Sequence, residues 1–375
     1  MLRAWLAISF LIFNSTGIAQ TASVPLPELM SLSQALTLAE TRHPQVLKHA
    51  AQVQAAQALL RRDGFEGRCQ YDGVESAQIG LDNAQRQQRI DIIHRFFAVL
   101  AADLQFAADN EAMSLAFFPF SRADERRERF GSVSELVVME KRVGYFAELD
   151  QRNQSLRAQR STRLKLALAM GLPQAKPDYL IEPDLSIYDR ETPDFDDLLE
   201  QVLLSSPLIR QKSEQLAQLK LVEAQFAGET PCVVLDLPLA ANIHQAGHQQ
   251  SGLTVSSIDG YFATLDHAAL LAVIAAEEAK FLALDFRIRE QVLKWVQTLE
   301  KLEQQIEQNA QNLAYRERAL DKSRLLYEME VSAQIGQAQA DMAKLLWQDA
   351  RSKYKRALVW EKIDAALAKP EVNFE

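Results

Sequence analysis

The residue types that most often bind metals are sparse in this chain and poorly placed for it. His244 and His248 are four positions apart, a spacing that binds a metal ion when both side chains project from one helix. An Ala-Gly pair stands between them, in a segment typical of a turn, and no glutamate follows in a catalytic pattern. The sequence therefore predicts no metal site.

Common catalytic and nucleotide-binding patterns are missing as well. The chain has no G-x-S-x-G turn, no P-loop, no glycine-rich dinucleotide turn and no carboxylate pair that its spacing would bring together. A formal net charge of -9, with no basic stripe, argues against nucleic acid as a partner. We therefore expect neither an enzyme nor a cofactor-binding protein, and no nucleic-acid binding.

The N-terminus has the composition of a secretory signal. An arginine precedes an apolar run at residues 4–13, and Gly-Ile-Ala at 17–19 supplies the small residues that suit cleavage. The run is shorter than the roughly 20 residues that a membrane-spanning helix needs. We predict a signal peptide at residues 1–19 and an exported mature protein.

Cys69 and Cys232 are the two cysteines of the chain. An even number in an exported protein permits a disulfide, which would close a loop of about 160 residues and stabilise the fold by about 5 kcal/mol in the chain-entropy model. Two free thiols fit the sequence equally well, and both alternatives stay open.

The most regular pattern of the chain lies between residues 282 and 320. Apolar residues recur there at alternating intervals of four and three, the 3.5-residue period of a coiled-coil seam. A helix is predicted over about 265–326, and at ~1.5 Å per residue it would be ~90 Å long. The helical pattern resumes after Ser332, which predicts a long α-hairpin over 265–368. The seam positions are Ile288, Val292, Trp295, Leu299, Leu302, Ile306, Asn309 and Leu313.

The chain repeats this unit. Pro44 is predicted to open a second helix after a short one, and Pro207 is its counterpart 163 residues later. The two cysteines are separated by the same interval. Val-Ser at 133–134 recurs 198 residues later. Two tandem repeats are therefore predicted, at 20–190 and 191–375. The first holds a short loop at 63–76, a helix from about 77 to 118 and a proline-rich linker at 173–193.

The second repeat carries about 35 additional residues before its long helix. Two runs rich in β-forming residues in this insertion predict one β-hairpin at 231–259. The corresponding loop of the first repeat is too short for two strands across a membrane. The predicted fold class is mainly α, with long antiparallel coiled-coil α-hairpins in two tandem repeats and a short β-hairpin region.

Several short motifs, in this order along the chain, resemble the TolC-like outer-membrane efflux proteins. They are A-L-x-L-A-x-x-x-H-P at 35–44, R-F-G-S-V-S at 129–134, L-A-L-A-M-G-L-P at 166–173 and L-L-x-x-V-L-x-x-S-P at 198–207. A tyrosine followed by Val-Ser at 327–332 matches the second turn of that family. The resemblance covers nearly the whole mature chain, in both repeats.

The resemblance implies a homotrimer in the cell outer membrane. Its α-hairpins would form a periplasmic α-barrel, continued by a β-barrel surrounded by outer-membrane lipid. It also implies a passive conduit for small molecules in a tripartite efflux or secretion system, with a periplasmic adaptor and an inner-membrane pump as partners. The adaptor would dock at the hairpin tips, which correspond here to Phe130, Gly131, Ser132, Val133, Ser134, Tyr327, Glu330, Val331 and Ser332.

Two departures from the family pattern leave a second hypothesis open. The shortened strand regions would give a trimer about six strands, and the reduced β-barrel would then be too small to surround a tunnel. At the periplasmic entrance, Gly336 and Gln339 stand where members of the family often have an aspartate. The alternative is a periplasmic α-helical interaction protein that derives from such a channel and no longer forms a pore.

Overall fold

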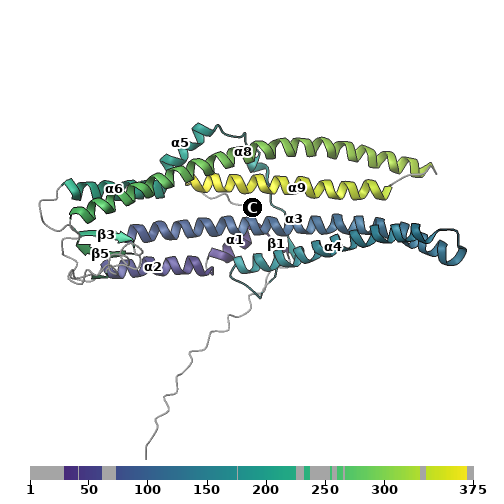
Figure 1. The fold of residues 1–375 in the computed structure, drawn as a ribbon, viewed down its shortest axis with the longest axis horizontal. Coiled ribbons are helices and arrows are strands. Elements are labelled where there is room, and N and C mark those ends of the chain that lie inside the picture. Colours follow the sequence, from purple (N-terminus) through teal and green to yellow (C-terminus); the bar gives the residue numbers. More distant parts are fainter. Residues whose placement is uncertain are drawn as a thin grey trace, which may run out of the picture.

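The computed structural model describes residues 29–40, 42–60, 73–174, 176–224, 232–236, 254–255, 260–264, 267–329 and 335–369. Long helices lie side by side in an elongated body (Figure 1). Both long hairpins turn at one end of this body, and the strands lie at the other end. The predicted signal peptide, His244 and His248 all lie outside the described residues.

The first long hairpin consists of α3 (Gly73–Phe130) and α4 (Glu135–Ala169). A shorter helix, α2 (Pro44–Leu60), packs along the other part of α3, so that α2 and α4 follow one another along the same long helix. The sequence predicted that the helix would end near residue 118, but α3 continues through Pro119. A proline removes one backbone hydrogen bond, and Pro119 is exposed, so that water can satisfy the freed carbonyl group.

The second half of the chain builds a similar arrangement, and the tandem repeats themselves remain a prediction. Its hairpin consists of α8 (His267–Glu328) and α9 (Ile335–Ala366), and α6 (Pro207–Ala224) packs along the first part of α8. The predicted seam of α8 is confirmed, because all eight positions are buried or half-buried. The two repeats are joined where α3 packs against α9. The wall of the molecule is therefore made of four columns: α2 with α4, then α3, then α6 with α9, then α8.

Short elements cross the middle of this wall. They are α1 (Leu32–Glu40), α5 (Phe195–Ser205), η1 (Ser186–Tyr188) and a parallel pair of strands, β1 (Leu29–Met30) and β2 (Tyr179–Leu180). As predicted, Pro44 and Pro207 begin α2 and α6, positions where the missing N–H of proline costs no helical hydrogen bond. The main core lies at this level and includes the fully buried Phe96 and Ile363.

The strands of the insertion are β3 (Cys232–Asp236), β4 (Thr254–Val255) and β5 (Gly260–Thr264), in the antiparallel order β3-β5-β4. The predicted hairpin at 231–259 was therefore wrong in its second strand. The main partner of β3 is β5, which begins at Gly260, beyond the predicted range. Five residue pairs join β3 to β5, whereas β4 contributes two. Alternation along a strand shows which faces it has but not which strand pairs with it. Cys69 lies outside the described residues, and the predicted disulfide remains a prediction.

Candidate functional site

The tip of the first hairpin is a tight turn built around a glycine. The N–H of Gly131 donates to the carbonyl of Arg127 (3.1 Å), and Gly131 has φ +57, a conformation that favours glycine at the end of a helix. Ser134 then caps α4 by accepting a hydrogen bond from the N–H of Val137. Phe130 is left 72% exposed at the end of the molecule.

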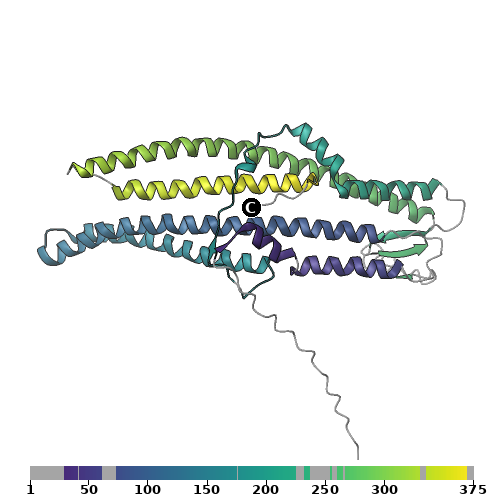
Figure 2. The ribbon, with the colours of Figure 1, turned by 180° about the vertical axis from the view of Figure 1, so that it is seen from behind.

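The second tip lies at the same end of the body, as the view from behind also shows (Figure 2). Tyr327 and Met329 are 68% and 57% exposed there. Glu330, Val331 and Ser332 lie outside the described residues. The structure thus brings the described residues of both predicted tips to one end, and their role in docking remains a prediction.

The two residues assigned to the periplasmic entrance differ in their surroundings. Gly336 lies where α9 comes close to α3, since a Cβ atom at this glycine would be 2.3 Å from Leu115 Cδ2. Gln339 is exposed. The nearby acid is Asp341, whose carboxylate accepts a hydrogen bond from the Arg316 guanidinium at 2.6 Å and so ties α9 to α8. Sequence spacing alone did not identify this pair.

The α4 edge of the wall carries an exposed apolar stripe that the sequence reasoning missed. Its members follow the coiled-coil intervals 3-4-3, and their exposed fractions lie between 53% and 78%. We call this set the α4 stripe: Leu136, Met139, Val143 and Phe146. Val138 of α4 is buried where α4 packs on α3, whereas the four residues of the α4 stripe stay exposed on another side of the helix.

The α8 edge carries a similar set. At ~100° per residue its five members fall within about 80° on one side of the helix, and each is at least 43% exposed. We call this set the α8 stripe: Leu282, Phe286, Leu293, Tyr315 and Leu325. Heptad reasoning had assigned only the buried seam of α8, because the polar residues between these widely spaced positions hide the second face.

A buried polar network links the first half of the chain to α9 at the middle of the wall. The Tyr188 hydroxyl donates to Glu361 Oε1, and Arg89 Nε lies 3.4 Å from the other oxygen of that carboxylate. Burial, together with the charge of Glu361, raises the pKa of Tyr188 well above its ordinary value. Tyr354 donates to Glu182 at 2.7 Å, and burial raises the pKa of its phenol in the same way.

Two further features are absent from the described part of the chain. Its residues include no group of three or more His, Cys, Asp or Glu side chains that could hold a metal ion. Among the same residues, none of the helices is both long and apolar enough to span a bilayer.

Known proteins were found that share this architecture. No protein-family model and no curated protein sequence matches the chain. Solved structures do, each with 90% of this chain covered. A membrane protein from Pseudomonas aeruginosa has 13% identity and a TM-score of 0.56, over 93% of its own length. CusC, described for transmembrane channel formation, has 14% identity and a TM-score of 0.56, over 92% of its length. The CmeC outer membrane channel of Campylobacter jejuni has 11% identity and a TM-score of 0.56, over 85% of its length.

The fold is that of the TolC-like outer-membrane channels. The predicted fold class is therefore confirmed, with mainly α structure and long antiparallel hairpins. The α4 stripe lies on the first column of the wall and the α8 stripe on the last, so the two stripes are at opposite edges.

Proposed function

We propose that this protein is the subunit of a ring-shaped outer-membrane channel, a passive conduit for small molecules across the periplasm and outer membrane. The observation that carries the proposal is the pair of exposed apolar stripes at opposite edges of a wall one helix thick. Soluble proteins seldom leave so much apolar surface uncovered along two helices, and such surfaces mark interfaces.

The two stripes differ, so contact between them is heterologous: the α4 edge of one copy meets the α8 edge of the next. Contacts of this kind generate a closed ring when the rotation between copies closes. In the tip half of the wall, the α4 stripe lies at the height of Tyr315 and Leu325 on α8, since both sets lie within about 25 Å of the hairpin turns at ~1.5 Å per residue. The resemblance to the TolC-like family favours a ring of three copies.

The tip end is the proposed docking side for a periplasmic adaptor and an inner-membrane pump. The exposed Phe130 and Tyr327 rings support this, because aromatic side chains are enriched at the centres of protein interfaces. The strand end, with β3 and β5, is the proposed outer-membrane side.

The test combines membrane fractionation with conductance. We expect the native protein in the outer membrane, as an oligomer on unboiled gels, with ion conductance in planar bilayers. The variant Leu136→Glu/Val143→Glu places charges in the α4 stripe and should abolish the oligomer. Lys141→Glu, an exposed position on the other side of α4, is the matched control and should assemble normally. A soluble periplasmic monomer without conductance would refute the proposal and favour the interaction protein instead.

A further inference from the structure

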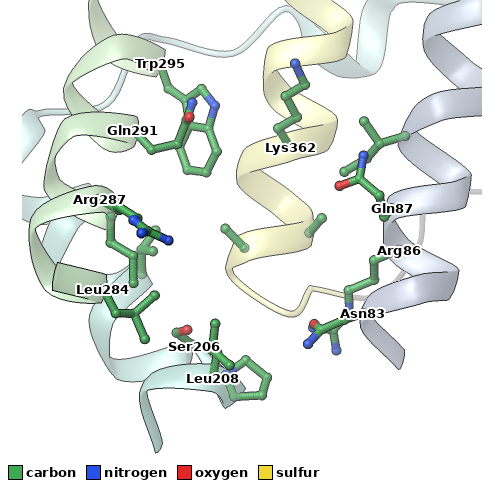
Figure 3. Close-up of a pocket in the computed structure, with 16 residues that line it drawn as sticks. Asn83, Arg86, Gln87, Ser206, Leu208, Leu284, Arg287, Gln291, Trp295 and Lys362 are labelled. Carbon is green, nitrogen blue, oxygen red and sulfur yellow. The ribbon is translucent and has the colours of Figure 1, made fainter. Parts of the chain in front are cut away.

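A cavity of about 700 Å³ opens inside the wall, at the place where one helix of a column ends and the next begins. Here α9 ends near Ala366 and α6 begins at Pro207, with α3 and α8 on either side. Figure 3 shows side chains from these helices converging on the hollow. Its volume is in the range of sites that hold drug-sized molecules.

The corresponding junction of the first repeat is closed. There α4 ends at Ala169. Gly171 follows it, and a Cβ atom on this glycine would lie 2.9 Å from the carbonyl oxygen of Arg42, just before α2. The buried side-chain amide of Gln88 also donates to the carbonyl of Ala39 at 2.7 Å. The hollow is therefore a feature of the second repeat and not a consequence of stacking two helices end to end.

The charged residues that line the cavity are all cations. Arg86 comes from α3, Arg287 from α8 and Lys362 from α9, and no carboxylate is among the lining residues. Within the described part of the chain, none of these three cations takes part in an ion pair. Burial, and to a lesser degree the charge of Lys294, lowers the pKa of Lys362. An anion in the cavity would offset both effects.

The rest of the lining is uncharged, and it combines the polar side chains of Asn83, Gln87, Ser206 and Gln291 with apolar ones. Trp295 and Ile288 form a wall of the cavity on α8, beside the amide of Gln291. The indole Nε1 of Trp295 is buried and has no hydrogen-bond acceptor in the structure. An unsatisfied buried donor costs about 1–3 kcal/mol in folding, and an acceptor that reached this indole would remove that cost.

We propose that this cavity binds an organic anion, a carboxylate that carries an aromatic or other compact apolar body. The carboxylate lies among Arg86, Arg287 and Lys362, and the apolar body packs on Trp295 and Ile288. All of these residues come from one copy of the chain. The proposal therefore stands apart from ring formation and from the proposed channel function.

The test is calorimetric titration of the purified full-length protein in an uncharged detergent. Two probes share one skeleton and differ in charge: 4-phenylbutanoate and 4-phenylbutan-1-ol. We expect the carboxylate to bind at least about tenfold more tightly than the alcohol. Binding of the carboxylate should also change the tryptophan fluorescence of the wild type but not that of Trp295→Phe. The double variant Arg86→Gln/Arg287→Gln should lose about tenfold in affinity for the carboxylate and none for the alcohol.

The matched control is Arg289→Gln. Arg289 is on α8, two residues from Arg287, but it pairs with Asp285 at 2.7 Å and does not line the cavity. The Arg289→Gln variant should bind the carboxylate with the affinity of the wild type. Circular dichroism should show equal helix content in all variants. Equal affinity for both probes, no binding of either, or an equal loss in Arg289→Gln would each overturn the proposal.

Discussion

Replacing Tyr188 by Phe tests the network that fastens the two repeats together. Tyr188 is fully buried, and its hydroxyl donates to the carboxylate of Glu361, itself only 5% exposed. The variant keeps the ring but leaves the carboxylate with one donor fewer. Since a hydrogen bond to a charged group contributes about 1.5–3 kcal/mol, Tyr188→Phe should lower the free energy of unfolding by that amount at neutral pH.

The same network predicts how this difference changes with pH. Burial raises the pKa of Tyr188 in the folded state far above the value of 10.0 that an exposed tyrosine has. Above pH 10 the unfolded chain therefore releases a proton that the folded chain keeps, and the stabilisation by Tyr188 is lost as pH rises. At pH 11 the wild type has lost about 1.4 kcal/mol through this residue, and Tyr188→Phe has lost none.

Urea unfolding followed by circular dichroism at pH 9 and pH 11 measures both effects. The pKa of Lys362 is lowered in the folded state, so this residue makes the free energy of unfolding rise with pH until the ordinary lysine pKa is reached. Lys362 is present in both proteins, and its contribution cancels in the difference between them. The gap between wild type and Tyr188→Phe should thus narrow by about 1.4 kcal/mol between the two pH values. Tyr179→Phe, at a ring that is 67% exposed and outside both stripes, is the control and should match the wild type. A gap that is the same at both pH values would refute the reasoning.

Two further predictions concern helix ends and the first hairpin. Gly171→Ala should destabilise the fold by about 1–2 kcal/mol, because the residue has φ +71 and faces the Arg42 carbonyl, whereas Ala368→Gly, at φ 51 after α9, should stabilise it by about 1 kcal/mol. Thermal unfolding checks both, and a melting temperature that falls in Ala368→Gly would contradict this account. Asp103→Asn should cost about 1–2 kcal/mol, because Asp103 accepts from both Arg163 nitrogens at 2.7 and 2.9 Å. Urea unfolding checks it, with the exposed Lys141→Gln as control.

Several parts of this architecture could be predicted from the sequence because their causes are local. The 3.5-residue period marked the buried seam of α8, and the prediction of a helix at 265–326 lies within two residues of His267–Glu328. Pro44 and Pro207 marked the starts of α2 and α6, since proline is tolerated at the first turn of a helix and not inside it. Pro119 shows the limit of this rule, because an exposed position in a long packed helix tolerates the lost hydrogen bond.

The strands and the stripes were harder to predict. A pattern of alternation could not tell whether β3 would pair with β4 or β5, which are separated from it by different loop lengths. Exposed apolar residues such as Leu136 and Phe286 follow helical spacing, but spacing alone does not say which of two apolar faces packs within the chain.

By itself, the sequence determined that this chain contains two long α-hairpins, because helix periodicity, proline positions and tight glycine turns act over a few residues. Only the tertiary structure decided which residues that are far apart in the chain contact each other. Tyr188 and Glu361 are 173 residues apart and share one hydrogen bond in the core. Likewise, the cavity at Arg86, Arg287 and Lys362 exists only because α9 stops where α6 begins. Such contacts depend on how distant helices pack, which no local pattern of residues encodes.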